Sequence, residues 1–358
     1  MLTMKIVYVN GRFLTQKITG VQRFAYEIVL HLSRLRSDIV ILVPDLSSIN
    51  NEYSIKELNI HEIIGGGGHY WEQVTLPLFL KNNNSGLLVN LCNTGPAFYK
   101  KQIVTQHDIS YVRYPTSFSK RFRFFYLCLT PFLLRNSKAV VTVSNFSKRE
   151  IITYFKHKKD NIFVIPNAVS EHFNSDGIIR DNMSDYFLTV SSINYHKNII
   201  GLVQAILSSN IQIKLKIIGE TTKVFRRLNL NINDPRISFL GHVSDDELID
   251  LYKGAKAFIF PSLYEGFGIP PLEAQSCCCP VISSDRTVMK EILHDSVLYF
   301  DPESNSQIIQ AIELINSDEG LRRSLIDKGR NNVRRFSWVN SANSLSFLID
   351  RVCLNIVE

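Results

Sequence analysis

The first half of the chain alternates short apolar runs with longer amphipathic stretches. Runs rich in Val, Ile and Leu occur at residues 5–9, 39–43, 87–91, 103–105, 139–143 and 162–165. They are too apolar to alternate in polarity, which is typical of strands buried on both faces. Helical patterns lie between them, as at residues 21–35 and 120–135. This order predicts a parallel sheet with right-handed crossovers, and therefore a doubly wound α/β domain.

The same alternation restarts after a polar stretch at residues 170–184. That stretch is rich in residues that favour turns, namely Asn174, Asp176, Gly177, Asp181 and Asn182. Strands are then predicted at residues 186–190, 214–218, 237–240, 257–260, 280–283 and 297–300, and helices at 199–208, 245–252, 271–276, 305–316, 319–333 and 337–354. Two Rossmann-like, doubly wound α/β domains in tandem are therefore expected.

The domain boundaries follow from this pattern. The expected N-terminal domain covers residues 1–170, a linker covers 171–184, and the expected C-terminal domain covers 185–336. Residues 337–358 contain a last helix that is able to cross back to the N-terminal domain. Two such sheets facing each other place a cleft between the carboxyl ends of their strands, where open α/β sheets bind ligands. Function is therefore expected in the loops that follow the strands.

Length and composition exclude several classes of protein. A chain of 358 residues suits two domains, and 45% hydrophobic with 20% charged residues excludes a disordered or collagen-like chain. Forty Lys and Arg against 33 Asp and Glu give a formal charge of +7, which favours anionic partners such as nucleotides, phosphates or an acidic membrane surface. No uncharged apolar stretch approaches the roughly 20 residues of a spanning helix. The longest candidate, at 124–134, is interrupted by Pro131.

The cysteines and the N-terminal residues indicate a compartment. The six cysteines show no paired Cys-x-x-Cys spacing: Cys92, Cys128, Cys277, Cys278, Cys279 and Cys353. No charged-then-apolar leader precedes the first predicted strand, so a reducing, cytoplasmic location is expected. The three consecutive cysteines are interpreted as small apolar filling, because no second Cys or His pair at metal-ligand spacing follows them.

The strongest chemical signal lies at residues 260–274. Two carboxylates, Glu265 and Glu273, stand on either side of a turn that contains Gly266 and Gly268. A following pair of prolines introduces a helix, so Glu273 is expected in the first turn of that helix. Carboxylates accept hydrogen bonds from hydroxyls, so this pair suits a polyhydroxylated ligand, with one carboxylate on a sugar ring and the other on a ribose.

A second candidate loop follows the first predicted strand and leads into a helix at Gly20 and Val21. Gly20 leaves room for a phosphate, and the helix start presents free N–H groups, so the loop is a candidate anion cradle. A tight turn with a solvated Arg23 is the alternative interpretation. The loop matches neither the dinucleotide-binding nor the P-loop glycine pattern.

Ordered motifs along nearly the whole chain resemble those of the retaining GT-B glycosyltransferases of family 4, which use nucleotide-sugar donors. The spacing of Glu265 and Glu273 is similar to the Glu-x7-Glu signature of that family. The other motifs that carry the resemblance are Thr19-Gly20-Val21-Gln22-Arg23, Trp71-Glu72-Gln73, His107-Asp108, Val141-Thr142-Val143-Ser144-Asn145, Pro166-Asn167-Ala168-Val169, Gly241-His242-Val243 and Phe260-Pro261-Ser262. The first two look most like bacterial surface-polysaccharide enzymes that transfer mannose or rhamnose.

The resemblance implies roles for residues of the C-terminal domain. Glu265 would hold the donor sugar with help from backbone N–H groups at Gly266, Phe267 and Gly268. Glu273 would hold the ribose, and Lys197 would neutralise the donor diphosphate. Elementary chemistry independently supports this role for Lys197, since a positioned cation stabilises the charge that builds on a departing nucleoside diphosphate.

The resemblance also implies a second cation before the lysine, but that position is Ser192 here, so Arg23 or Arg113 would have to replace it. The base would lie between Gly219 and the loop at Val243, largely against backbone. In the N-terminal domain, Gly20 and Val21 would contact the donor. The resemblance places His107 against the transferred sugar, although a lone histidine is by itself more often a packing residue.

The expected mechanism is metal-independent. Retaining enzymes that this chain resembles lack an obvious covalent nucleophile, and the usual scheme is front-face attack in which the leaving phosphate assists deprotonation of the acceptor. The paired-carboxylate scheme of glycoside hydrolases is a poor match, because Glu273 is expected at the ribose. No Asp-x-Asp-like pair stands where a metal-bound diphosphate would need it. No metal and no cofactor besides the nucleotide-sugar co-substrate is therefore expected.

Two further features each have two interpretations. The basic aromatic segment at residues 120–135 either lies in an anionic membrane interface or is an ordinary crossover helix. The four consecutive glycines at residues 65–68 form either a lid over the acceptor channel or a plain flexible loop.

The sequence therefore favours a retaining hexosyltransferase that moves mannose from GDP-mannose to a growing or lipid-linked glycan, as in O-antigen or capsule synthesis. It would work at the inner face of the cytoplasmic membrane and would have no nucleic-acid partner. A nucleotide-sugar epimerase of the same two-domain plan is one alternative. A catalytically silent glycan- or nucleotide-binding protein is another, which the presence of Glu265, Glu273 and Lys197 disfavours.

Overall fold

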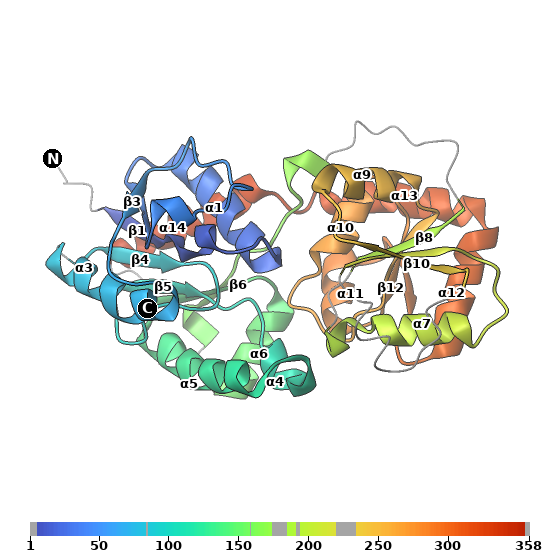
Figure 1. The fold of residues 1–358 in the computed structure, drawn as a ribbon, viewed down its shortest axis with the longest axis horizontal. Helices are drawn as coiled ribbons and strands as arrows, with labels where there is room; N and C mark the ends of the chain where they lie inside the picture. The colour runs from blue at the N-terminus through green and yellow to red at the C-terminus, as the bar shows by residue number, and fades with distance from the viewer. Residues whose placement is uncertain are drawn as a thin grey trace. The chain divides into compact units, whose positions relative to one another are not determined.

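The computed structural model describes residues 6–83, 85–157, 159–173, 185–190, 194–219 and 234–354. The chain divides into two compact units (Figure 1). Unit 1 comprises Met1–Val112, Lys120–Asn167 and Ser337–Glu358, and unit 2 comprises Arg113–Ser119 and Ala168–Phe336. The segment Arg113–Ser119 thus belongs to unit 2, although the residues on both sides of it belong to unit 1.

Unit 1 is built on one parallel sheet of seven strands in the order β3-β2-β1-β4-β5-β6-β7. The strands are β1 (Val7–Asn10), β2 (Ile39–Val43), β3 (Ile60–Glu62), β4 (Leu87–Asn90), β5 (Gln102–Thr105), β6 (Ala139–Thr142) and β7 (Ile162–Val164). Every residue of β1, β4, β5 and β6 is buried, as their mostly apolar runs predict. Sequence reasoning missed β3, because this three-residue edge strand is only partly buried and contains no apolar run.

Helices cover both faces of this sheet (Figure 1). They are α1 (Gly20–Leu35), α2 (Gly68–Tyr70), α3 (Leu76–Asn82), α4 (Ser110–Arg113), α5 (Lys120–Asn136), α6 (Asn145–Phe155) and α14 (Trp338–Cys353). Four short helical turns of the described chain also lie in this unit: η1 (Gly11–Thr15), η2 (Leu46–Ser48), η3 (Trp71–Thr75) and η5 (Lys159–Asn161). The turn η4 (Pro115–Ser117) lies in the segment assigned to unit 2. Pro131 does not end α5 as a stop signal would, because it lies inside the helix on an exposed side, where water can satisfy the carbonyl that loses its partner.

The last helix of the described chain packs in unit 1. Along its length α14 lies against α1, and Trp338 contacts Phe24 with ring centroids 5.9 Å apart. Arg36 donates to Asp350 at 2.6 Å, and the Ser341 hydroxyl donates to the Pro166 carbonyl at 2.8 Å. The C-terminal helix therefore completes the core of the unit that contains the N-terminal strands.

Unit 2 contains a second parallel sheet, of six strands, in the order β10-β9-β8-β11-β12-β13. Its strands are β8 (Phe187–Val190), β9 (Leu215–Ile218), β10 (Ile237–Gly241), β11 (Ala257–Phe260), β12 (Val281–Ser284) and β13 (Leu298–Phe300). Its helices are α7 (Ile199–Leu207), α9 (Asp245–Gly254), α10 (Ile269–Ser276), α11 (Thr287–Leu293), α12 (Asn305–Ser317) and α13 (Glu319–Val333), with the turns η6 (Glu171–Phe173) and η7 (Tyr195–Lys197). Figure 1 shows α7 and α12 on one side of the sheet and α9 and α13 on the other.

Apolar packing holds each unit together. In unit 2, Leu202 and Ile206 of α7 and Ile308 and Ile312 of α12 pack on the buried strand residue Ile259. Every side chain in this set is fully buried, so each contributes about 1.5–3 kcal/mol of transfer free energy relative to exposure. The prediction of two α/β domains with parallel sheets is confirmed. Among the described residues, no helix is both long enough and apolar enough to cross a membrane.

In both sheets, strand order reverses direction at one point. The first strand of unit 1, β1, pairs with β2 on one side and β4 on the other, and in unit 2 β8 pairs with β9 and β11 in the same way. The crossovers leave such a pair of strands in opposite directions, and this place in the sheet is called its switch point. Ligands of open α/β sheets bind at the carboxyl ends of the strands there. Each unit therefore has one favoured ligand position.

Candidate functional site

Two predicted residues of unit 2 meet at its switch point. Lys197 follows β8 on the turn η7, and Glu265 follows β11, the neighbouring strand. Lys197 Nζ lies 2.7 Å from Glu265 Oε1 and 2.8 Å from Oε2, so the ammonium donates to both carboxylate oxygens. The side chains are 24% and 12% exposed, respectively, so the pair is accessible to a ligand. The structure thus brings together two groups for which separate roles were expected.

Backbone contacts hold the two loops against each other. The Leu263 N–H, two residues before the glutamate, donates to the His196 carbonyl at 2.7 Å. His196 is buried, and its Nδ1 lies 2.9 Å from the Ser117 hydroxyl in the segment 113–119. Asn198 is left-handed at φ 53°, and its side chain donates to the Pro302 carbonyl at 2.7 Å. These contacts fix the direction in which Lys197 projects.

The glycine turn after Glu265 presents backbone donors. Gly268 has φ 95° and begins α10, and a Cβ at this position would come within 2.7 Å of Met289 Cε. Only glycine fits both requirements. Among the described residues, the N–H groups of Phe267 and Gly268 have no hydrogen-bond acceptor, and all three residues of the turn 266–268 are buried.

Glu273 lies one turn deeper in the helix than predicted. The helix begins at Ile269 with Gly268 as its cap, so Glu273 is its fifth residue and no acidic residue occupies the first turn. The expectation of a first-turn glutamate was wrong, because the helix starts before the prolines and not at the second of them. Glu273 is 8% exposed, and the Tyr252 hydroxyl donates to its Oε2 at 3.4 Å. Burial and the adjacent Glu273 charge both raise the pKa of Tyr252, which keeps that phenol a donor.

The predicted base-flanking residues lie at the ends of β9 and β10. Gly219 has φ 123°, and its N–H donates to the Gly241 carbonyl at 2.8 Å, which joins the two loops. Val243 is half-buried in the loop after β10. Ser192, the position where a second cation was expected, lies outside the described residues, as part of the gap at 191–193. Of the two suggested replacements, Arg113 opens the segment 113–119 of unit 2, and Arg23 lies on α1 of unit 1.

His107 of unit 1 is buried after β5, with 6% exposure. Its Nε2 lies 2.9 Å from the Leu91 carbonyl, and a carbonyl only accepts, so Nε2 carries the proton and Nδ1 is an acceptor in the neutral ring. Burial lowers the pKa of His107 despite the Leu91 bond, which favours that neutral form. Phe24 packs edge-on at 4.8 Å between ring centroids. The residue is therefore a fixed acceptor of a hydrogen bond, suited to a hydroxyl.

Gly20 and Val21 are the first two residues of α1. The cap residue, Thr19, makes no side-chain hydrogen bond to the first-turn N–H groups, because its hydroxyl contacts the Gln22 side chain instead. Gly20 is exposed and Val21 is half-buried. The first-turn N–H groups of this 16-residue helix thus have no side-chain cap from Thr19.

Sequence reasoning missed a buried polar cluster at the switch point of unit 1. Asn10 at the end of β1 donates to Asn90 at the end of β4 at 3.0 Å and to Glu72 Oε1 at 2.8 Å. Arg12 donates to the same oxygen at 3.3 Å and to the Thr94 hydroxyl at 3.0 Å. Glu72 was noticed as part of a family motif, but no chemistry was assigned to it. The only sequence signal for the contact between Arg12 and Glu72 was the position of Arg12 just after the first strand.

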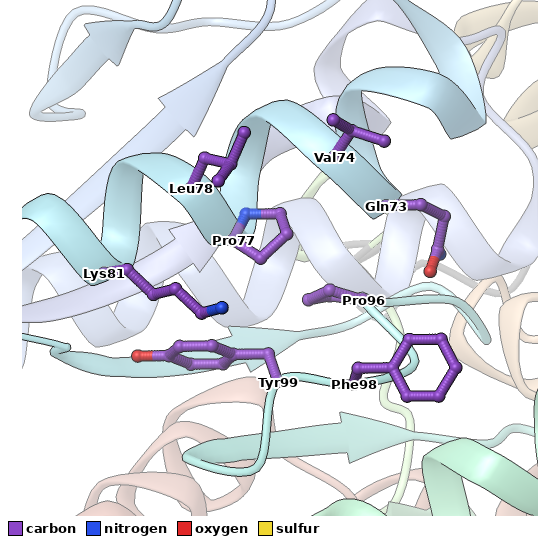
Figure 2. A pocket seen from close by; sticks show the side chains of 8 residues that line it. All are labelled: Gln73, Val74, Pro77, Leu78, Lys81, Pro96, Phe98 and Tyr99. Atoms are coloured by element: carbon purple, nitrogen blue, oxygen red, sulfur yellow. The ribbon is translucent and has the colours of Figure 1, made fainter.

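A surface groove lies elsewhere on unit 1, with a volume of about 240 Å³. Figure 2 shows its lining: Gln73, Val74, Pro77, Leu78, Lys81, Pro96, Phe98 and Tyr99. Phe98 is 81% exposed and packs on Phe132 of α5, with centroids 5.7 Å apart. The groove therefore joins an exposed apolar surface that continues onto α5.

The described residues form no metal-binding cluster, and the three consecutive cysteines lie in the interior. No group of three or more His, Cys, Asp and Glu side chains there is arranged to hold a metal ion. All six cysteines are free, and the three at positions 277–279 are buried. Burial raises the pKa of the Cys277 thiol to about 12, so this thiol is inert at neutral pH.

Comparisons with known proteins agree over most of the chain. A family model described as "Glycosyltransferase Family 4" matches residues 18–173, and one described as "Glycosyl transferases group 1" matches residues 170–332. The chain is 32% identical over 273 residues to O-antigen chain mannosyltransferase B of Escherichia coli, which covers 69% of this chain and 70% of the relative. It is 31% identical over 307 residues to O-antigen chain mannosyltransferase RfbU of Salmonella typhimurium, with 84% and 82% covered.

Solved structures show the same architecture. HepE of Anabaena, solved in complex with UDP and glucose, superposes with a TM-score of 0.76 over 97% of this chain and 99% of its own. The two sequences are 16% identical, so this likeness concerns the fold.

Proposed function

The chain belongs to the family-4 glycosyltransferases, and on that premise we propose that it transfers mannose from GDP-mannose to a growing or lipid-linked polysaccharide. Two relatives named as O-antigen mannosyltransferases support the sugar and the process. A structural neighbour that holds UDP and glucose supports a nucleotide-sugar donor. The proposal includes retention of configuration at the transferred carbon and independence from metal ions.

The observation that carries the proposal is the contact between Lys197 and Glu265 at the switch point of unit 2. Lys197 Nζ donates to both carboxylate oxygens of Glu265. A diphosphate carries more charge than a carboxylate and attracts the ammonium more strongly. On donor binding Lys197 would turn to the diphosphate, and Glu265 would become free to accept hydrogen bonds from sugar hydroxyls. The ion pair thus holds both side chains in position at the loops that follow β8 and β11.

The remaining residues would complete the donor site. The free N–H groups of Phe267 and Gly268 would donate to the donor, and Glu273 would accept from the ribose hydroxyls. His107 Nδ1 would accept from a hydroxyl of the transferred sugar. As the glycosidic bond breaks, charge builds on the leaving diphosphate, where Lys197 stabilises it. The same phosphate would take the proton of the attacking acceptor hydroxyl, so no protein base is required at that atom.

A donor screen tests this function. The purified protein is heated with GDP-mannose, UDP-glucose, GDP and UDP, with and without EDTA, and GDP-mannose and GDP should raise its melting temperature in both buffers. Proton NMR of the product formed on an alkyl mannoside should show an α-linkage, which means retention. If no nucleotide or nucleotide sugar protects the protein, the donor assignment is wrong. Epimerised sugar nucleotide without any acceptor would indicate the epimerase.

We propose in addition that unit 1 meets an anionic membrane surface through the groove and α5. Large apolar side chains protrude there, with Phe98 81%, Phe124 71% and Leu78 54% exposed. The helices α3 and α5 carry exposed cations at Lys81, Lys120, Arg121 and Arg135. Protruding aromatic groups and basic side chains together favour an anionic interface.

Vesicle sedimentation tests the membrane proposal. Binding to phosphatidylglycerol vesicles should exceed binding to phosphatidylcholine vesicles and should weaken in high salt. The variant Phe98→Ser with Phe124→Ser should lose most of this binding. Phe347→Ser is the matched control, because Phe347 is 66% exposed on α14 of the same unit. Equal loss in the control would show that the effect is not specific to this surface.

A further inference from the structure

The buried carboxylate of Glu72 in unit 1 has four side-chain partners among the described residues. Glu72 is 1% exposed, and its Oε1 accepts hydrogen bonds from Asn10 at 2.8 Å, Thr94 at 2.9 Å and Arg12 at 3.3 Å. Its Oε2 lies 3.2 Å from Nδ1 of His69. Three partners therefore contact Oε1 of Glu72, and His69 contacts Oε2.

The carboxylate is charged despite its burial. Burial alone would raise the pKa of Glu72, but the His69 bond, the Arg12 charge and the bonds from Asn10 and Thr94 outweigh it and lower the pKa. A carboxylate only accepts hydrogen bonds. Nδ1 of His69 must therefore carry the proton that it shares with Glu72, so Nε2 of the neutral ring has a bare lone pair.

The other side of the histidine faces outward. The side chain of His69 is 44% exposed, although its Nδ1 contacts the buried Glu72. Part of the side chain therefore reaches the surface of the unit. Phe125 of α5 packs against the ring at 4.3 Å between centroids. Among the described residues, Nε2 has no hydrogen-bond partner. In its neutral form, a ring held on one edge and on one face thus has Nε2 as its remaining acceptor.

The local backbone is built to hold this group in place. Glu72 lies on η3, a single π-helical turn between α2 and α3, and such turns recur at functional sites. On one side of it Trp71 Nε1 donates to the Ile63 carbonyl at 2.8 Å. On the other, Gln73 donates to the Gly95 carbonyl at 2.7 Å and accepts from the Ala97 N–H at 2.9 Å. The three residues of this motif therefore anchor one rigid turn.

The position of the cluster also favours a ligand. Asn10 and Asn90 end β1 and β4, the two strands at the switch point of unit 1, where open sheets bind ligands. A phosphate is a poor ligand for the exposed edge of His69, because the bare nitrogen is itself an acceptor and Glu72 lies behind it with a negative charge. A hydroxyl group, which can donate, is complementary to it.

We propose that His69 binds the acceptor sugar, with Nε2 accepting a hydrogen bond from one of its hydroxyls, and that Glu72 is the residue that positions it. This inference rests on the proposed glycosyl transfer and adds to it a residue for the acceptor. No bond is made or broken at His69 in this role. The side chain orients the acceptor, while Arg12, Asn10 and Thr94 hold Glu72 in place.

The first test is spectroscopic and needs no turnover. Long-range ¹H–¹⁵N spectra of the full chain, assigned with His69→Gln, should show His69 with the proton on Nδ1 near pH 7.5. Addition of octyl α-mannoside should shift the Nε2 resonance. A proton found on Nε2 would overturn the proposal, and so would a resonance that stays unchanged at saturating mannoside.

The second test compares two near-isosteric variants. The amide nitrogen of His69→Asn replaces Nδ1 and keeps the bond to Glu72, but removes the group at Nε2. His69→Gln can place an amide oxygen near Nε2. With GDP-mannose saturating, His69→Asn should raise the KM for octyl α-mannoside about 10-fold, the size of one hydrogen bond, and His69→Gln should raise it less. Hydrolysis of GDP-mannose without acceptor should stay unchanged in both.

The matched control is His61→Asn, since His61 is also exposed in unit 1 and lies near a phenylalanine ring, Phe79, at 5.8 Å. It should not alter the KM for the mannoside. An unchanged KM for the mannoside in both His69 variants would refute the acceptor role. A fall in acceptor-free hydrolysis of GDP-mannose as large as the rise in KM would also refute it. If GDP-mannose neither protects the wild-type protein nor is turned over, the proposed function fails, and the histidine spectrum then decides this inference by itself.

Discussion

At the residue scale, Lys197 and Glu265 form a partly buried ion pair, in which each side chain has a proposed role in donor binding. Lys197→Ala should lower kcat by about 100-fold or more, since a cation that stabilises a developing diphosphate charge acts mainly in the transition state. Initial rates of mannose transfer measure this effect. Arg323→Ala is the control, because Arg323 pairs with Glu319 at 73% and 63% exposure in the same unit. A loss of activity in the control, or full activity without Lys197, would contradict the assignment.

His107 supports a prediction about pH. Burial lowers its pKa below the ordinary 6.5 in the folded protein, so below that pH the unfolded chain binds a proton that the folded chain does not. The contribution of His107 to stability is therefore complete above pH 6.5 and declines as the pH falls, by at most about 1.4 kcal/mol per pH unit. His107→Gln, which keeps a donor for Leu91, should flatten the fall in melting temperature between pH 6.5 and 5. An equally steep fall in the variant would assign the effect to other groups.

Single residues also show how far the sequence can be read. The sequence predicts a role for Glu265 from the carboxylate pair around a glycine turn, and for Lys197 and His107 mainly from their match to family motifs. Each of the three also follows a predicted strand, and strand-to-helix loops carry function in this architecture. The contact between Lys197 and Glu265 was not predicted, since the two residues are 68 positions apart and meet only when β8 pairs with β11. Glu72 was missed for the same reason, because its donors come from three separate segments of chain.

At the scale of elements, the turn between β11 and α10 is the most constrained. Gly268→Ala should destabilise the protein by about 1–3 kcal/mol, because φ 95° is strained for alanine and its Cβ would lie 2.7 Å from Met289 Cε. Chemical denaturation measures the loss. Gly67→Ala, with φ −140° and nothing within 4 Å of the added Cβ, should stay within about 0.5 kcal/mol of wild type. Equal losses in both variants would show that the glycine at 268 has no special role.

Elements were predicted well where packing follows local pattern. Both-sided burial makes a strand such as β11 apolar throughout, and an amphipathic stripe marks α13, whose bounds match the prediction. The π turn η3 was not foreseen, because its geometry depends on buried partners of Trp71 and Glu72 and not on periodicity. The start of α10 was placed too late for a related reason, since Gly268 caps the helix through its backbone conformation.

At the scale of the molecule, the C-terminal helix ties the end of the chain to unit 1. Trp338 is 3% exposed against Phe24, so Trp338→Ala should cost about 3–5 kcal/mol of the stability of that unit. Its Nε1 is buried without a partner among the described residues, so Trp338→Phe loses volume but no hydrogen bond and should cost much less. Val339→Ala is the control, since Val339 is 44% exposed on the same helix.

The same substitution separates the two units thermodynamically. Unit 2 contains Lys197, Glu265 and Glu273, and none of them depends on α14 for its position. In scanning calorimetry Trp338→Ala should lower one transition, while stabilisation by GDP of the other transition should persist, because ligand binding adds free energy only to the unit that holds the ligand. A single transition that falls as a whole, with the effect of GDP lost, would show that the donor site requires an intact unit 1.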